Sequence, residues 1–150
     1  MMKYPKEYKL KILNIDIEGF SPVPKRATAH AAAYDLKASE ACDIPPRATR
    51  IIRTDIKIAI PNGYVGYICS RSGLANNGVF VINAPGVIDA DYRGEIKVLL
   101  HNNDITAYHI NAGDRVAQLL FHRAYEANFV EQMELDETDR GEGGIGSTGV

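Results

Sequence analysis

Residues 86–95, GVIDADYRGE, place two aspartates, a tyrosine and an arginine between two apolar segments. Those segments, residues 79–82 and 96–100, predict the two strands of a hairpin. Side chains alternate between the two faces of a strand, so Asp89 and Asp91 share one acidic face if residues 87–91 stay extended. Such a face at the edge of a sheet can contact a ligand. On these residues alone, an ordinary solvated turn remains the alternative interpretation.

A second candidate site lies in residues 70–77, SRSGLANN. We expect Ser70 or Ser72 to cap a helical turn that begins near Leu74. The free amides of a helix start, a hydroxyl and the guanidinium of Arg71 together suit a phosphate group, because the helix dipole favours negative charge. A capped turn with a surface arginine is the structural alternative.

The chain ends in residues 140–150, which contain five glycines and predict a mobile arm, because glycine loses much backbone entropy on folding. Its arginine, serine and threonine could surround phosphate oxygens, although the lysine and the strand and helix of a P-loop are missing. A disordered tail is the alternative. Residues 131–139 are acidic and read as a solvated linker.

Length and charge limit the function classes. The chain has 150 residues, which fits one domain, and its net charge of −2 argues against a general nucleic-acid binder. Cys42 and Cys69 have no Cys-x-x-Cys spacing and read as reduced thiols. No segment has the apolar length of a leader or a membrane span. We therefore expect a cytoplasmic protein, or an intracellular or nuclear one in a host cell if the source is viral, with no membrane and no nucleic-acid partner.

Short apolar segments separated by Gly, Asn and Pro turns must position these candidate sites. Their alternating patterns and close spacing predict an all-β sandwich or barrel, with a jelly roll among the candidates. The four histidines are too scattered to form a metal site. The further predicted strands are residues 8–12, 52–60, 64–69, 105–110 and 115–121.

Five sequence blocks in this order resemble the trimeric deoxyuridine triphosphatases. Any one block could occur by chance, but five in order are specific. The blocks are AAAYDLKA around Asp35, SRSGLA at 70–75, GVIDADYRGE at 86–95, GDRVAQLLF at 113–121 and RGEGGIGSTG at 140–149.

The resemblance implies a distorted jelly-roll-like β-barrel or sandwich with one short helix. It implies a β domain over residues 1–135 and a flexible arm over residues 136–150 that closes an active site of a neighbouring subunit in a homotrimer. The implied reaction is hydrolysis of dUTP to dUMP and pyrophosphate by water attack on the α-phosphorus. That reaction keeps uracil out of DNA and supplies dUMP for dTMP synthesis.

The resemblance also assigns roles to residues. Asp89 resembles the acid that activates the water, and Tyr92 the aromatic that packs under the deoxyribose. Asn83, with backbone groups between Gly86 and Lys97, resembles the reader of the uracil edge. Asp35 resembles an acid that supports the site and its metal-bound water. The implied phosphate contacts are Arg71, Ser72, Gly73 and Gln118, and the implied arm contacts are Arg140, Ile145, Gly146, Ser147 and Thr148.

A triphosphate carries about four negative charges, so we expect Mg²⁺ held by phosphate oxygens and waters, with no direct protein ligand. Three residues depart from the family pattern: Ser70 replaces a usual Pro, Ala33 a usual Gly, and Ile145 a usual aromatic that stacks on the base. Two alternatives stay open, a dCTP deaminase of the same fold superfamily and a regulatory protein that binds nucleotide without turnover.

Overall fold

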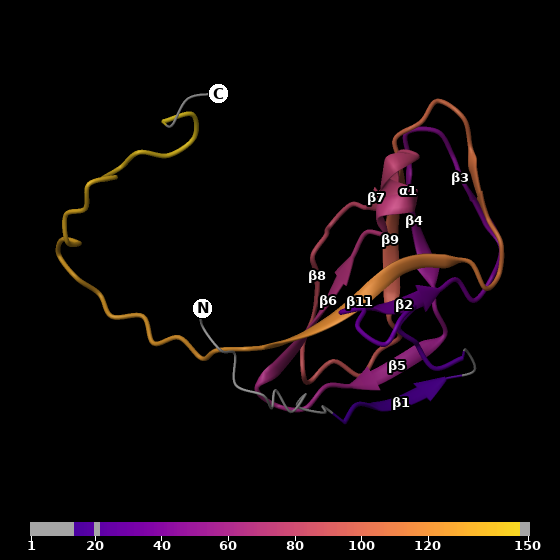
Figure 1. Cartoon of the computed structure of the whole chain (residues 1–150), viewed down its shortest axis with the longest axis horizontal. Helices are drawn as coiled ribbons and strands as arrows, with labels where there is room; N and C mark the ends of the chain where they lie inside the picture. The colour runs from indigo at the N-terminus through magenta and orange to yellow at the C-terminus, as the bar shows by residue number, and fades with distance from the viewer. Residues whose placement is uncertain (1–13, 20–21, 148–150) are drawn as a thin grey trace, which may run out of the picture.

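A computed structural model describes residues 14–19 and 22–147, and its regular structure consists of strands with one short helix (Figure 1). This confirms the predicted all-β class. In chain order the elements are β1 (Asp16–Gly19), β2 (Tyr34–Lys37), β3 (Cys42–Ile44), β4 (Thr49–Arg53), β5 (Ile56–Ala59), β6 (Tyr64–Cys69), α1 (Ser72–Asn76), β7 (Val79–Val81), β8 (Gly86–Ile88), β9 (Lys97–Asn102), β10 (Tyr108–Ile110) and β11 (Arg115–Arg123).

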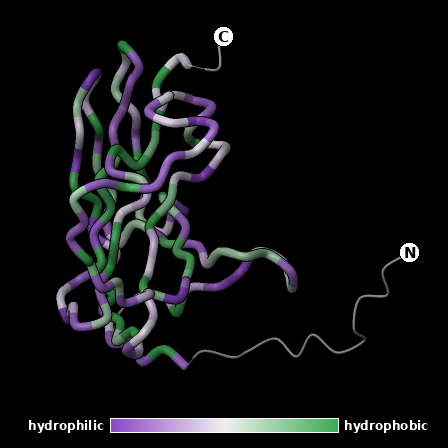
Figure 2. The backbone as a smooth tube through the Cα atoms, turned by 90° about the vertical axis from the view of Figure 1, so that its left-hand side faces the viewer, coloured by the Kyte–Doolittle hydropathy of each residue, from purple (hydrophilic) through white to green (hydrophobic). Residues whose placement is uncertain are grey.

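The described strands form a four-stranded sheet in the order β2-β11-β6-β8, a three-stranded sheet in the order β4-β9-β7, and the pairs β1-β5 and β10-β3. Every pairing is antiparallel. Alternate strand residues are buried, as in Ile56 and Ile58 of β5 or Val98 and Leu100 of β9, and they join one hydrophobic core. Hydrophobic residues recur along the packed strands of the body (Figure 2).

The single strand predicted over residues 52–60 is wrong, because β4 ends at Arg53 and β5 begins at Ile56. Asp55 has a positive φ of 58°, and the buried Thr54 hydroxyl donates a 2.5 Å hydrogen bond to the Ile96 carbonyl. This corner moves the chain from the sheet that contains β9 to the pair that contains β1. Both halves keep the alternating pattern, so the sequence looks continuous where the backbone turns.

The hairpin predicted from residues 79–82 and 96–100 is confirmed, because β7 pairs antiparallel with β9 and Val81 lies opposite Leu100. Between these two strands the chain also forms β8, which was not predicted and which pairs with β6 in the other sheet. β8 ends at Ile88, and the Tyr92 amide donates to the Asp89 carbonyl at 3.2 Å, which closes a turn. Residues 87–91 are therefore not extended throughout, and residues 89–96 form a loop that crosses from one sheet to the other.

The predicted helical turn is present, but its start and its cap differ from expectation. α1 begins at Ser72, and its N-cap residue Arg71 makes no side-chain capping hydrogen bond. The Ser70 hydroxyl instead accepts a hydrogen bond from the Val81 amide at 2.9 Å. Ser70 therefore ties the segment before α1 to β7 rather than capping the helix.

Of the remaining predicted strands, residues 64–69 match β6, residues 105–110 contribute only Tyr108–Ile110, and β11 continues past the predicted end to Arg123. The strand predicted over residues 8–12 lies outside the described residues. Among the described residues, no helix has the length and apolar character to cross a membrane.

The chain leaves the packed body after Arg123 and runs away from it (Figure 1). Residues 124–147 contain no strand or helix, and nearly all of them are exposed. Large apolar side chains are fully exposed there, including Phe129 at 95% and Met133 at 103%. Exposure of so many apolar side chains on one segment is a feature of surfaces that bind another protein.

Candidate active site

Asp35 lies between two arginines on one face of the four-stranded sheet. Arg71 Nε is 3.2 Å from Asp35 Oδ1, and Arg115 Nη1 is 3.6 Å from Asp35 Oδ2. The strand order β2-β11-β6 brings them together, since Asp35 is in β2, Arg115 begins β11 and Arg71 follows β6. The Asp35 side chain is only 18% exposed. Two positive charges and one negative charge leave this cluster cationic, as an anion site requires.

Gln118 joins the cluster through the sheet register. It lies opposite Asp35 on β2 and opposite Cys69 on β6. Its Nε2 donates a 2.8 Å hydrogen bond to the Ser70 carbonyl, which fixes the chain just before Arg71. Asp35 and Gln118 also line a small cavity of about 290 Å³, whose other walls are Ala27, Ala31, Ala32, Ala33 and Leu120.

Ser72 and Gly73 form the first turn of α1 and are exposed. The amides of a first helical turn have no carbonyl partner within the helix. A Cβ at Gly73 would meet no atom within 4 Å, so the space beside this backbone is open. Arg71, Ser72 and Gly73 therefore present a guanidinium, a hydroxyl and backbone amides side by side.

Asn83 and Gly86 lie together at the start of β8. Gly86 is buried and pairs with Ile68 of β6, and a Cβ on Gly86 would stand 3.2 Å from Asn83 Nδ2. The missing side chain at Gly86 thus lets the Asn83 amide pack directly on the backbone. An amide in this place can donate and accept hydrogen bonds beside the strand edge.

Asp89 and Tyr92 lie in the turn that follows β8, and both are exposed. The Tyr92 hydroxyl donates to the Glu95 carbonyl at 3.0 Å, which lays the ring across the loop. Arg93 Nη1 donates to the carbonyls of Ala90 and Tyr92 at 2.7 and 2.9 Å. The loop is held by its own hydrogen bonds, while the Asp89 carboxylate stays accessible to water.

Glu95 anchors the far end of this loop. Its carboxylate accepts hydrogen bonds from Arg53 Nε at 3.2 Å and from the Asp55 amide at 3.0 Å. Burial acts to raise the pKa of Glu95, but the hydrogen bonds from Asp55 and Arg53 outweigh it and hold that pKa below its ordinary value. Lys97 follows at the start of β9, opposite Arg53, and is exposed.

The structure does not bring Asp89 beside Arg71 within one chain. Asp89 follows Ile88, which pairs with Gly66, and Arg71 lies five residues after Gly66 along β6 and its extension. At about 3.3 Å per residue, the two groups are separated by roughly 16 Å. Asp89 therefore lies toward the Tyr64 end of β6 and Arg71 beyond its Cys69 end, while Gly86, which pairs with Ile68, lies near the Cys69 end.

The arm residues form a third group. Residues 125–147 make their hydrogen bonds within that segment, for example from Arg140 Nε to the Gly143 carbonyl at 2.8 Å. Ile145, Gly146 and Ser147 are exposed, and Thr148 lies outside the described residues. The described chain does not place its own arm on either of the other two groups.

Three positioning contacts were not assigned from the sequence: those of Arg115, Glu95 and Arg53. Arg115 and Glu95 belong to two of the five blocks, and that was the only signal available. Neither the spacing nor the residue types indicated which partner each would contact.

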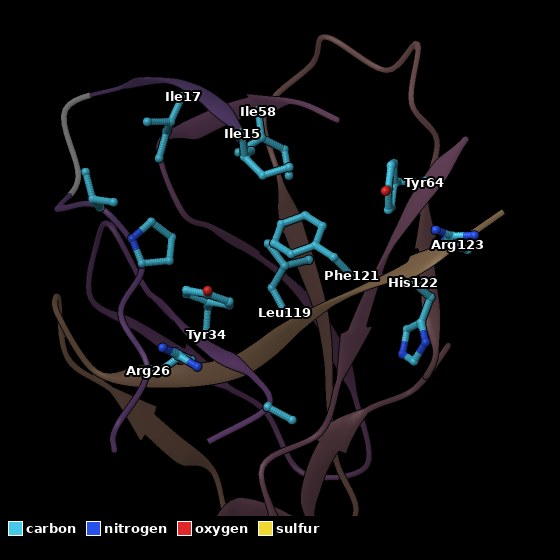
Figure 3. A pocket seen from close by; sticks show the side chains of 13 residues that line it. Ile15, Ile17, Arg26, Tyr34, Ile58, Tyr64, Leu119, Phe121, His122 and Arg123 are labelled. Atoms are coloured by element: carbon cyan, nitrogen blue, oxygen red, sulfur yellow. The ribbon is translucent and has the colours of Figure 1, made fainter. Parts of the chain in front are cut away.

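A pocket of about 910 Å³ was also not predicted. Its walls come from β1, β2, β5, β6 and β11 and from the segment before β2 that contains Arg26 (Figure 3). The Tyr34 and Phe121 rings meet edge to face there, with centroids 6.1 Å apart. Most of its lining is apolar, with Ile15, Ile17, Ile58 and Leu119 beside these rings.

The dUTPase family model matches residues 20–149. The chain belongs to the dUTPase family. It is accordingly a dUTP diphosphatase, a hydrolase of nucleotide metabolism. The deoxyuridine 5′-triphosphate nucleotidohydrolase of Tropheryma whipplei (strain Twist) is 47% identical over 128 residues, which cover 84% of this chain and 88% of that one. The enzyme of the same name from Helicobacter pylori (strain J99) is 43% identical over 143 residues, 95% of this chain and 97% of that one.

Solved dUTPase structures share the fold. A mutant dUTPase of Staphylococcus bacteriophage 80alpha with dUpNHpp has a TM-score of 0.84 at 25% identity and covers 91% of this chain and 99% of that one. A mutant dUTPase of phage phi11 of S. aureus, described with a structural Mg(II) ion, has a TM-score of 0.75 at 25% identity, with 81% and 97% covered. These likenesses confirm the jelly-roll-like fold and the resemblance that the five blocks indicated.

Proposed function

We propose that Asp89 is the general base of dUTP hydrolysis. It accepts a proton from a water whose oxygen bonds to the α-phosphorus, while the bond from that phosphorus to the bridging oxygen breaks and pyrophosphate leaves. The support is chemical, since Asp89 is an exposed carboxylate in a loop held by its own hydrogen bonds. A positioned base of this kind contributes about 10²- to 10⁴-fold in rate.

Arg71, Ser72, Gly73 and Gln118 are proposed to hold the phosphates. The support is the cationic cluster around Asp35 and the open backbone of the first turn of α1. A guanidinium matches phosphate oxygens in charge and geometry. Asp35 orients Arg71 and is not itself a phosphate ligand, because a carboxylate repels the triphosphate.

Tyr92 and Asn83 are proposed to select the nucleoside. The Tyr92 ring packs under the deoxyribose, where a 2′-hydroxyl would clash. Asn83 and backbone groups between Gly86 and Lys97 pair with the uracil edge, so cytosine would leave polar groups unpaired. A mismatch of that kind discriminates by roughly 10⁴-fold.

Mg²⁺ is proposed as the cofactor, held by phosphate oxygens and water. Among the described residues, no three His, Cys, Asp or Glu side chains gather into a metal site, and the Asp35 carboxylate already contacts two arginines. This donor set does not fit a protein-only cage, but it fits an ion that the substrate brings. When bound, Mg²⁺ would neutralise phosphate charge.

The separation between Asp89 and Arg71 supports the proposal that the active protein is a homotrimer. Asp89 and Arg71 are roughly 16 Å apart along β6, which is too far for both to act on one α-phosphate in the same chain. If Asp89 and Tyr92 of one subunit meet Arg71 and Gln118 of another, the site is complete. The arm over residues 136–150 would close it, with Arg140, Ile145, Gly146, Ser147 and Thr148 on the nucleotide.

Two apolar surfaces support assembly. Residues 124–135 carry exposed apolar side chains outside the body, including Phe129 and Met133, and the pocket around Tyr34 and Phe121 offers apolar walls (Figure 3). Burial of such surface drives stable association. The apolar side chains of one subunit and the pocket of another are complementary in character.

The direct test incubates the protein with Mg²⁺ and dUTP, dCTP, dTTP or UTP, and follows both pyrophosphate and ammonia. We expect pyrophosphate from dUTP alone. Ammonia from dCTP would indicate a deaminase, and binding without pyrophosphate would indicate a regulatory protein. Sedimentation equilibrium gives the mass of the assembly, and a monomer that is fully active would exclude the trimer.

A further inference from the structure

We propose that Arg115 is a positioning residue for Arg71. It holds the Asp35 carboxylate away from Nη2 of the Arg71 guanidinium, so that Nη2 stays open to a substrate phosphate. The inference rests on the phosphate role proposed above for Arg71. Arg115 acts on Arg71 in two ways. Its side chain attracts the Asp35 carboxylate, with Arg115 Nη1 3.6 Å from Asp35 Oδ2. Its backbone carbonyl accepts a 3.0 Å hydrogen bond from Arg71 Nη1.

A β-bulge in β11 turns the Arg115 side chain toward Asp35 and Arg71. Along the pairing of β11 with β2, Arg115 lies opposite Lys37, but Ala117 lies opposite Leu36, so Val116 is an extra residue on β11. Val116 and Ala117 are both buried. Strict alternation from the outward-facing Gln118 would turn Arg115 toward the core, and the bulge instead turns it to the face that carries Gln118 and Asp35.

The donors of Arg71 are divided between two fixed partners. Nε contacts Asp35 and Nη1 donates to the Arg115 carbonyl. Nη2 has no hydrogen-bond acceptor among the described residues, so it is the donor available to a phosphate. A carboxylate can accept from both Nε and Nη2 of one guanidinium in a bidentate pair.

Without the Arg115 side chain, the second Asp35 oxygen is free to move onto Nη2. Asp35 would then compete with the substrate phosphate for the same donor. This affects binding of the substrate and its transition state alike, so the expected signature is a higher KM with little change in kcat.

The test is a double-mutant cycle with Arg115→Ala, Arg71→Ala and the double variant, assayed with dUTP and Mg²⁺. We expect Arg115→Ala to raise KM at least about tenfold, the scale of one hydrogen bond to a charged group, with kcat within about twofold of wild type. Added to Arg71→Ala, it should have no further effect, because Arg115 acts through Arg71. Arg115→Lys, which keeps the charge near Asp35, should recover part of the loss.

Arg50→Ala is the matched control, since Arg50 is exposed in β4 and far from this cluster in the sheet order. Unchanged KM in Arg115→Ala, a kcat loss at constant KM, or additive effects with Arg71→Ala would each overturn the inference while leaving the role of Arg71 intact. If Arg71→Ala itself has normal kinetics, the phosphate role fails, and the inference fails with it. If Arg115→Ala unfolds in a thermal melt, Arg115→Lys replaces it in the cycle, with the same pattern and a smaller change expected.

Discussion

The Tyr92 hydroxyl donates a hydrogen bond to the carbonyl oxygen of Glu95, three residues ahead, at 3.0 Å. The ring crosses Gly94, where a Cβ would collide with the hydroxyl and the adjacent ring carbons. The Glu95 carboxylate in turn binds Arg53 and the Asp55 amide at the corner between β4 and β5. The position of the Tyr92 ring is therefore linked to a corner of the barrel distant in sequence.

The first prediction concerns Gly94→Ala, which should displace the Tyr92 ring because the new methyl group occupies the path of the ring. If that ring excludes the 2′-hydroxyl, the preference for dUTP over UTP in kcat/KM should fall by about tenfold, the scale of one misplaced packing contact. Tyr92→Phe keeps the ring and loses the hydrogen bond to Glu95, so it shows how much of the loss comes from that bond alone. An unchanged preference in a folded Gly94→Ala protein would contradict the role of the ring.

The second prediction concerns acid stability. The pKa of Glu95 is lower in the folded protein than its ordinary value of 4.5, so its contribution to stability is present above that value and is lost as pH falls through the folded pKa. Glu95→Gln should lower Tm at neutral pH, and the difference from wild type should shrink below pH 4.5. Melting curves across this range check it, with Glu134→Gln in the exposed segment as control. A difference in Tm between wild type and Glu95→Gln that grows toward acid pH would contradict this prediction.

Much of the fold followed from the sequence. Short alternating segments predicted an all-β fold, and β6 appears with the expected bounds. The corner at Asp55 was missed because an alternating pattern continues through it, and alternation reports burial rather than backbone direction. The pairing of β7 with β9 was predicted, but β8 between them was missed, because its partner β6 is distant in sequence and the polar residues after Ile88 suggested one long turn.

The sequence named candidate site residues but did not give their geometry. The five blocks named Asp35, Arg71 and Gln118, and the structure places these three together on one face. The role of Arg115 depends on a one-residue bulge at Val116, which leaves no mark in residue type or spacing. The capping of α1 by a serine failed because Ser70 has a competing partner in Val81, a contact that spans eleven residues.

The third prediction is complementation between chains. A variant truncated before Arg140 and a full-length Asp89→Asn variant should each be nearly inactive. After subunit exchange, mixed trimers would contain some sites with an intact Asp89 and an intact arm from different chains, so activity should return. Light scattering with a labelled subunit verifies that exchange has taken place. Absence of recovery after verified exchange would show that the arm acts on its own chain.

The last prediction is that Asp89→Asn lowers kcat by at least about 10²-fold while the fold and dUTP binding persist. Asn has the same size and can still hold a water by a hydrogen bond, but it cannot take the proton as the water attacks the α-phosphorus. Loss of a negative charge near a triphosphate relieves Coulomb repulsion, so KM should stay level or fall. Melting curves should match wild type, because the Asp89 side chain is exposed and makes no contact within the described chain that Asn would remove.

Asp91→Asn is the matched control for this change. Asp91 lies in the same turn, is also exposed, and differs from Asp89 by two positions. Because the chain turns after Ile88, the two carboxylates do not share the face of one extended strand, and their effects should separate. The measurement is kcat and KM for both variants. A near-normal kcat in Asp89→Asn, or a larger loss in a folded Asp91→Asn protein, would assign the base to another residue.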